Sequence, residues 1–190
     1  TLVKLTKDKL SLSLILMIFP ELRNIKIFSK IKESHKNLFK NDDFIFLLSL
    51  MIIDETDNSD YFLYRFNISK KEQKRMKLLD LFYKKKINFK NFNEKNLNKI
   101  FYYDGRQAII DIINFKLFTS KKFEKNLIKL IEVFKKKEIP NMPIRANDLM
   151  IKYNIPEGRS LGNKLKTIEE IWVQNSFVIN ENQLLKIIKS

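Results

Sequence analysis

The sequence has no cysteine, one histidine and three glycines, and each scarcity removes a class of function. Without cysteine there are no disulfides and no thiolate metal sites, which fits a reducing compartment, so we expect a cytoplasmic protein. His35 alone cannot form a histidine metal cluster or a histidine dyad. The few glycines form neither the G-x-x-x-x-G-K-[ST] nor the G-x-G-x-x-G phosphate loop. We therefore predict no catalytic residue, no metal ligand and no cofactor site in this segment.

Long apolar runs are missing as well. The two longest cover residues 12–19 and 44–53, which is shorter than the roughly 20 residues that cross a bilayer. The first ten residues also lack the apolar core of a signal peptide. We expect no contact with a membrane. The chain begins at Thr1 rather than Met, so we expect a processed protein or a segment of a longer one.

Positive charge is abundant. The 37 Lys and Arg outweigh 22 Asp and Glu, a formal net charge of +15. Residues 65–99 hold twelve basic and three acidic residues, a balance of +9, whereas residues 141–190 hold seven and five, a balance of +2. Such a balance favours a polyanionic partner, chiefly nucleic acid. The alternative is codon bias, because Lys, Asn and Ile dominate while Arg is scarce.

Helical periodicity runs along most of the chain and predicts an all-α fold. Apolar residues make up 44% of the sequence, with sixteen Phe, so a packed core is expected. Prolines 140 and 143 cannot continue a helix and mark a boundary. We therefore predict a helical neck-end and body over residues 1–139 and a small helical tail domain over residues 140–190.

Local signals place several helices in the body. The expected helices cover residues 4–19, 25–39, 44–54, 61–66, 70–84, 94–104, 106–118 and 121–137. Asp42 or Asp43 can cap the third. Ser69 and Glu72 form a capping box, and Gly105 stands where a helix ends in the left-handed conformation.

The tail concentrates the rare backbone-shaping residues. Two short helices, 146–153 and 160–173, are expected, with Asn154 left-handed, Pro156 as a stop and Gly158 in the turn between them. Gly162 would let another backbone approach closely. The glycines can serve only to shape this elbow, or the elbow can bind phosphate through helix N-terminal amides beside basic side chains.

The pattern P-I-x-x-x-D-L-M-x-x-x-x-I-P-E-G-x-x-L-G-x-x-L over residues 143–165, followed by E-E-I-W-V-Q-N-S-F, resembles the C-terminal tail of bacterial class II tRNA nucleotidyltransferases. These are the CCA-adding enzymes and their poly(A) polymerase relatives, and the alphaproteobacterial branch is the most similar. The family's pattern differs at Ala146 and Asn154, where it has Gly, and at Arg159, where it has Pro. The tail residues expected to shape the fold are Asp148, Leu149, Asn154, Pro156, Gly158, Gly162, Leu165 and Trp172.

Looser, collinear likeness extends upstream, at I-F-P-E-L (18–22), F-N-I-S-K-K-E-Q-K-R-M-K-L-L (66–79) and the stretch 97–115 that contains Gly105, Arg106 and Asp111. The resemblance implies a body and tail that hold tRNA so that its 3′ end reaches an N-terminal head of the same polypeptide. That head carries G-S and D-x-D motifs, binds Mg²⁺ with CTP or ATP, and has no equivalent in this sequence. The parent would be a tRNA-processing nucleotidyltransferase. The alternatives are the same region of a poly(A) polymerase, or a stand-alone helical protein-interaction module.

Basic side chains are the expected contacts to tRNA phosphates. Arg106 can contact RNA or pair with Asp111 inside the body, and we favour the pair with Asp111. We expect Trp172 to belong to the core rather than to stack on a base. The predicted RNA-binding residues are Lys70, Lys71, Lys74, Arg75, Lys84, Lys85, Lys86, Arg145, Lys152, Arg159 and Lys164.

Overall fold

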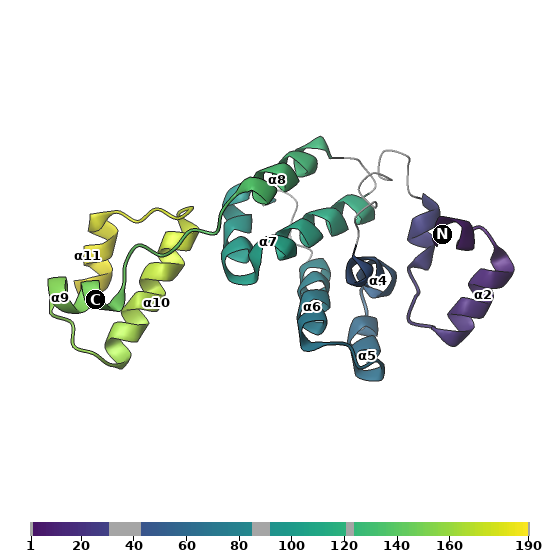
Figure 1. Cartoon of the computed structure of the whole chain (residues 1–190), viewed down its shortest axis with the longest axis horizontal. Helices are drawn as coiled ribbons and strands as arrows, with labels where there is room; N and C mark the ends of the chain where they lie inside the picture. Colours follow the sequence, from purple (N-terminus) through teal and green to yellow (C-terminus); the bar gives the residue numbers. More distant parts are fainter. Residues whose placement is uncertain (1, 31–42, 85–91, 121–123, 190) are drawn as a thin grey trace. The chain divides into compact units, whose positions relative to one another are not determined.

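The computed structural model describes residues 2–30, 43–84, 92–120 and 124–189 (Figure 1). Within these ranges all regular secondary structure is helical, which confirms the all-α class. None of the described helices is both long and apolar enough to span a membrane. The chain forms two compact units, unit 1 of Thr1–Phe89 with Ile110–Ile131 and unit 2 of Lys90–Ile109 with Glu132–Ser190. The division predicted between residues 139 and 140 therefore falls inside unit 2.

Unit 1 begins with α1 (Leu2–Leu5), α2 (Lys9–Ile18) and the 3₁₀ helix η1 (Ile25–Lys30). The single helix expected over residues 4–19 is wrong, because Asp8 interrupts it and caps α2. Its carboxylate accepts from the Leu10 N–H at 3.1 Å and from the Ser11 hydroxyl at 2.5 Å. The remainder of the helix expected over 25–39 lies outside the described residues.

Three helices with strong local signals follow in unit 1 (Figure 1). Helix α4 (Phe44–Ile52) is capped by Asp43, whose carboxylate accepts from the Ile45 N–H at 2.8 Å. Helix α5 (Asn58–Arg65) begins three residues before the predicted start at 61. Helix α6 (Lys70–Lys84) opens with the predicted capping box. Both α5 and α6 contact α4, and seven residues of α4 are buried: Ile45, Phe46, Leu48, Ser49, Leu50, Met51 and Ile52.

Helix α7 (Glu94–Thr119) is interrupted at Gly105, as the sequence predicts. The φ of Gly105, +87°, is positive as expected. Its ψ of 176° is that of an extended residue rather than of a left-handed helical one. Glycine tolerates this conformation because it has no Cβ. Helix α8 (Lys125–Lys136) begins later than the predicted 121, and it buries Leu127, Ile131 and Phe134.

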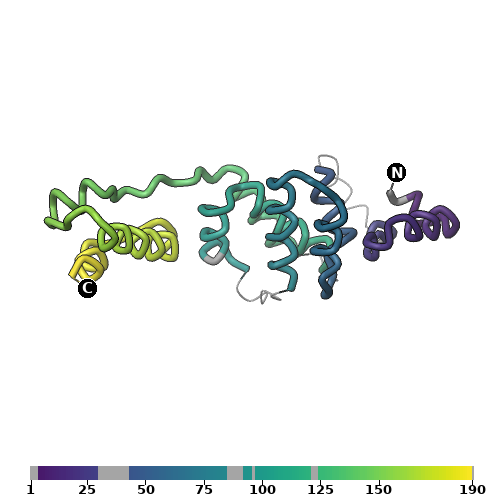
Figure 2. The backbone as a smooth tube through the Cα atoms, turned by 90° about the horizontal axis from the view of Figure 1, so that it is seen from below, coloured from purple at the N-terminus to yellow at the C-terminus, as the bar shows by residue number. Residues whose placement is uncertain are grey.

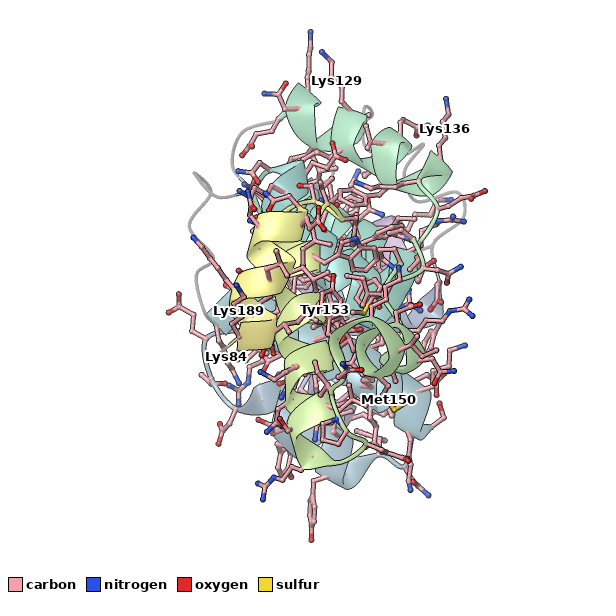
Figure 3. All side chains as sticks on the ribbon, turned by 90° about the vertical axis from the view of Figure 1, so that its left-hand side faces the viewer. Lys84, Lys129, Lys136, Met150, Tyr153 and Lys189 are labelled. Atoms are coloured by element: carbon pink, nitrogen blue, oxygen red, sulfur yellow. The ribbon has the colours of Figure 1, made fainter. Side chains whose placement is uncertain are left out.

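The last three helices lie in unit 2: α9 (Ala146–Tyr153), α10 (Arg159–Gln174) and α11 (Glu181–Lys189). Figure 2 follows the backbone of these helices, and both α9 and α11 contact α10. The three helices share a hydrophobic core, and Met150 and Tyr153 of α9, labelled in Figure 3, pack against it. The buried members of that core are Leu149, Ile155, Leu161, Ile168 and Ile187.

Helix α11 is not among the helices predicted from the sequence, although a local signal for it exists. The Asn180 side chain accepts from the Gln183 N–H at 2.8 Å, and the Gln183 side chain accepts from the Asn180 N–H at 3.2 Å. This reciprocal pair is a capping box built from amides. The spacing N-x-x-Q before an amphipathic run was the sign of α11.

Candidate nucleic-acid interface

The predicted body cations differ in how far they are exposed and in whether the structure shows an acidic partner for them. Lys70, Lys71 and Lys74 lie on the exposed surface of α6. Arg75 and Lys84, on the same helix, have acidic partners inside unit 1. The remaining two, Lys85 and Lys86, lie outside the described residues.

Arg75 is held between two carboxylates. Its Nε and Nη2 donate to the two oxygens of Asp111, the second at 2.9 Å, and its Nη1 donates to Asp43. The Asp111 side chain is only 3% exposed and that of Arg75 17%. The hydrogen bonds to Asp111 and then to Asp43 raise the pKa of Arg75 against the opposing effect of burial. The structure therefore gives Arg75 a role in joining helices in place of the predicted RNA contact.

The predicted pair between Arg106 and Asp111 is wrong, since each has another partner. Asp111 binds Arg75, and Arg106 donates through Nη2 to the backbone carbonyl of Lys137 at 3.0 Å. The structural role expected of Arg106 is thus fulfilled through a backbone acceptor. Because that contact is exposed, it leaves much of the guanidinium open to solvent.

Lys84 is also engaged by acids. Its ammonium lies 2.8 Å from Asp80 and 3.9 Å from Asp60. The hydrogen bond to Asp80 raises the pKa of Lys84, with further support from the nearby charge of Asp60. An RNA phosphate would have to compete with these carboxylates for the ammonium group.

The elbow between α9 and α10 forms as the sequence predicts. Asn154 ends α9 with φ 52° and ψ 36°, a left-handed residue, and Gly158 precedes α10 with φ +147°. Asp148 accepts from the Arg145 N–H at 2.8 Å and so secures the start of α9. Pro156 lies exposed between the two helices. Since Gly158 has no side chain, the first turn of α10 has no side-chain cap.

Gly162 does not serve the predicted close approach. A Cβ at this position would meet nothing within 4 Å, apart from its chain neighbours and its own helix backbone. The residue lies on the exposed side of α10, whereas Leu161 beside it is buried and Leu165 is half-buried against the tail core. The expectation fails because the core contacts of α10 come from its other face.

The tail cations also divide. Lys164 donates to the carbonyl oxygens of Ile187 at 3.1 Å and Ile188 at 2.9 Å, so it ties α10 to the end of α11 instead of facing a phosphate. Arg145, Lys152 and Arg159 are exposed. Among the described residues, no carboxylate lies within ion-pair distance of these three. They form the open basic group around the elbow.

Trp172 belongs to an aromatic cluster in unit 2. It is 3% exposed, as expected of a core residue, and its ring centroid lies 5.4 Å from that of Tyr102 and 5.1 Å from that of Phe177. The Tyr102 hydroxyl donates to Glu169 at 2.8 Å. Burial, followed by this hydrogen bond, raises the pKa of Tyr102 to about 12. The indole is therefore closed to base stacking.

Sequence reasoning missed other exposed cations. In Figure 3 the side chains of Lys129 and Lys136 extend outward from α8. Their signal was the amphipathic period of α8, which places lysines opposite its buried residues. The additional exposed lysines in the described helices include Lys77, Lys95, Lys99, Lys125, Lys129, Lys136 and Lys166.

Comparison of the chain with models of known protein families gives no match, and a search among curated proteins gives no significant relative. Within the described ranges, no group of three His, Cys, Asp or Glu is placed to hold a metal ion. The likeness to tRNA nucleotidyltransferases thus remains a prediction from the sequence.

Proposed function

We propose that this chain is the tRNA-binding C-terminal part of a CCA tRNA nucleotidyltransferase, which holds a folded tRNA while its 3′ end reaches a catalytic head of the same polypeptide. The observation that carries the proposal is the α9–α10 elbow. There a left-handed Asn154 and a positive-φ Gly158 present an uncapped first turn of α10 next to Arg159. Helix N-terminal amides together with a guanidinium suit a phosphate oxygen.

The residues that resemble the family motif have local roles that such an elbow needs. Asp148 secures the start of α9, and Leu149 is fully buried beneath the elbow. Asn154 and Gly158 supply the backbone conformations that other residues adopt at a cost. These roles explain the motif residues by the fold alone, without any contact to RNA. In the proposal, the contacts to phosphate are therefore made by exposed cations.

Two groups of cations can act on a sugar–phosphate surface. The elbow group consists of Arg145, Lys152 and Arg159, and the body group consists of Lys70, Lys71 and Lys77 on α6. Recognition of the shape and phosphates of a folded RNA duplex is the mode that such surfaces support. The same surfaces would serve a poly(A) polymerase, which is the alternative within the family.

A protein-interaction module is the second candidate, and one observation favours it. Helix α2 leaves an apolar face in solvent, with Leu10 72% and Met17 77% exposed and Leu14 and Ile18 also open. These four positions are spaced for one helical face. An exposed apolar face of this kind is typical of a surface that binds another protein.

Binding of a labelled tRNA at two salt concentrations tests the proposal. We expect affinity to fall by at least about a hundredfold between 50 and 200 mM salt, because several phosphates are neutralised. Replacing Arg145, Lys152 and Arg159 with Gln should weaken binding further than replacing three exposed lysines of the N-terminal region, Lys4, Lys7 and Lys26. Both triple variants remove three positive charges, so a difference reports position rather than net charge. Absent or salt-insensitive binding of tRNA would favour the protein-interaction module.

The gene offers a second test. The proposal expects the coding sequence upstream of Thr1 to encode a head with G-S and D-x-D motifs. An open reading frame that starts immediately before Thr1 would contradict the assignment to a nucleotidyltransferase.

A further inference from the structure

A small open cavity in unit 2 lies where the first half of α7 meets the end of α10. It is lined by Lys95, Lys99, Val173, Gln174 and Asn175, and its volume is about 340 Å³. A water molecule occupies about 30 Å³ in the liquid. The cavity therefore has room for a phosphate group together with part of its hydration shell.

The charge of this cavity is positive. Lys95 and Lys99 are four residues apart, so their side chains leave the same face of α7. None of the described residues that line the cavity carries a carboxylate. The nearest acid along the chain, Glu94, is engaged by the ammonium of Lys137. Two lysines that line one hollow, with no acid among its described lining residues, favour an anion.

Residues at the end of α10 bring hydrogen-bond donors to the cavity. The side-chain amides of Gln174 and Asn175 each carry two N–H donors. Within the described residues neither side chain has a hydrogen-bond partner. The cavity thus combines charge from α7 with free amide donors from the end of α10.

Three carbonyls in the last turn of α10 already have backbone donors. The carbonyls of Ile171 and Val173 accept from the Asn175 N–H, and that of Trp172 accepts from the Phe177 N–H at 2.8 Å. A backbone cap already occupies these acceptors, which weakens the alternative that Lys95 and Lys99 only complete the helix end.

The turn that supports this wall is strained. Ser176 and Phe177 have φ values of 58° and 68°, a conformation that costs energy for any residue with a Cβ. The ring of Phe177 is held at 5.1 Å from Trp172 and 6.1 Å from Tyr102, with the Lys137 ammonium 5.6 Å from its centroid. Strained backbone fixed by such packing is common next to functional sites.

From these observations we infer that the cavity, here named the Lys95–Lys99 pocket, binds a phosphate group. Lys95 and Lys99 supply the charge, and Gln174 and Asn175 supply directional hydrogen bonds. The inference deepens the proposed function and rests on it for the expected source, a backbone phosphate of RNA. Free inorganic phosphate has the same chemistry and is the other possible source.

NMR on the ¹⁵N-labelled chain tests the pocket directly. The side-chain amide resonances of Gln174 and Asn175 are followed while inorganic phosphate is added, and then while tRNA is added. The test variant is Lys95→Gln with Lys99→Gln. The matched control is Lys125→Gln with Lys129→Gln, because those two lysines are also exposed and four residues apart on a helix. Thermal unfolding of both variants checks that the fold is retained.

We expect saturable shifts of the two amides in the wild type and the control, and their loss in the Lys95/Lys99 variant. For tRNA we expect the affinity of that variant to be about tenfold below that of the control, as for the loss of a charged hydrogen-bonded contact. If phosphate shifts the amides but the chain does not bind tRNA, the inference that the pocket binds phosphate stands, with free phosphate as the ligand. The same result would refute the proposed function. Shifts with neither ligand, together with equal tRNA affinity of the two variants, would overturn the pocket while leaving tRNA binding intact.

Discussion

The Arg75 guanidinium and the Asp111 carboxylate form a two-point ion pair between residues that lie 36 positions apart in the chain. The pair joins α6 to the second half of α7, and Asp43 at the start of α4 adds a third partner. One arginine therefore links three helices of unit 1. Arg75 therefore stabilises the fold of unit 1, although its position on a lysine-rich helix predicted a contact to RNA.

Replacing Arg75 with Met should destabilise the protein by about 3 kcal/mol, because it leaves the buried Asp111 carboxylate without this partner. The free energy of unfolding in urea measures the loss. Lys71→Met on the same helix is the matched control, and since Lys71 is exposed its effect should stay within about 0.5 kcal/mol. Equal effects of the two substitutions would contradict a structural role for Arg75.

The ion pair of Asp43 predicts that the free energy of unfolding falls at low pH. Burial acts to raise the pKa of its carboxyl group, but the hydrogen bonds from Arg75 and the Ile45 amide lower it below its ordinary value of 3.8. A folded-state pKa below the unfolded one contributes stability above pH 3.8, which is lost as pH falls through the lower, folded-state pKa. Asp43→Asn removes this contribution while keeping a good N-cap residue.

Wild type should thus be more stable than Asp43→Asn at pH 7, by a few tenths to about 1 kcal/mol since Asp43 is half-exposed. The difference should shrink at pH 3 and below. Urea unfolding at the two pH values measures it. Asp57→Asn is the control, because Asp57 accepts no cap hydrogen bond at the start of α5. A difference that persists undiminished in acid would contradict the ion pair as its origin.

The elbow gives a prediction about backbone conformation. Asn154→Ala should destabilise the tail by about 1 kcal/mol, because alanine adopts the left-handed conformation at a cost that Gly avoids. Asn154→Gly should change stability by only a few tenths of that amount. Asn147→Ala, within right-handed α9, is the control and should have little effect. Thermal unfolding separates the three variants, and an alanine at 154 as stable as the glycine would refute the role of Asn154.

Features set by neighbours in the chain were predictable from the sequence. The capping box of Ser69 and Glu72, the cap at Asp43, the interruption at Gly105 and the left-handed Asn154 each follow from a local rule. The rules of caps and left-handed residues act over three or four positions. A linear pattern contains all the information that they require.

Features set by distant neighbours could not be predicted. Nothing in a linear pattern indicates that Arg75 meets Asp111, or that Lys164 meets the carbonyls of Ile187 and Ile188. Both depend on which helices pack together. For this reason the predictions for the candidate interface needed more correction than those for the fold, since Arg75, Lys84 and Lys164 are predicted RNA-binding cations that have internal partners.

The contact between Tyr102 and Glu169 predicts how the free energy of unfolding changes at high pH. The hydroxyl of Tyr102 donates to the Glu169 carboxylate, 67 residues away, at 2.8 Å. Its pKa in the folded protein is about 12, raised from an ordinary value of 10.0 first by burial and then by this hydrogen bond. The raised pKa contributes stability below pH 10 that is lost as pH rises from 10 to 12.

Tyr102→Phe should therefore lose about 1 kcal/mol at pH 7, where it lacks the hydrogen bond. Between pH 10 and 12 the wild type should lose more stability than the variant, so the two free energies of unfolding converge. Tyr64→Phe is the control because Tyr64 is 91% exposed, and it should follow the wild type at every pH. Urea unfolding at pH 7, 10 and 11.5 measures the three proteins. Deprotonation of the many lysines affects all of them alike, so a constant gap between wild type and Tyr102→Phe would show that the Tyr102–Glu169 contact does not govern the alkaline limb.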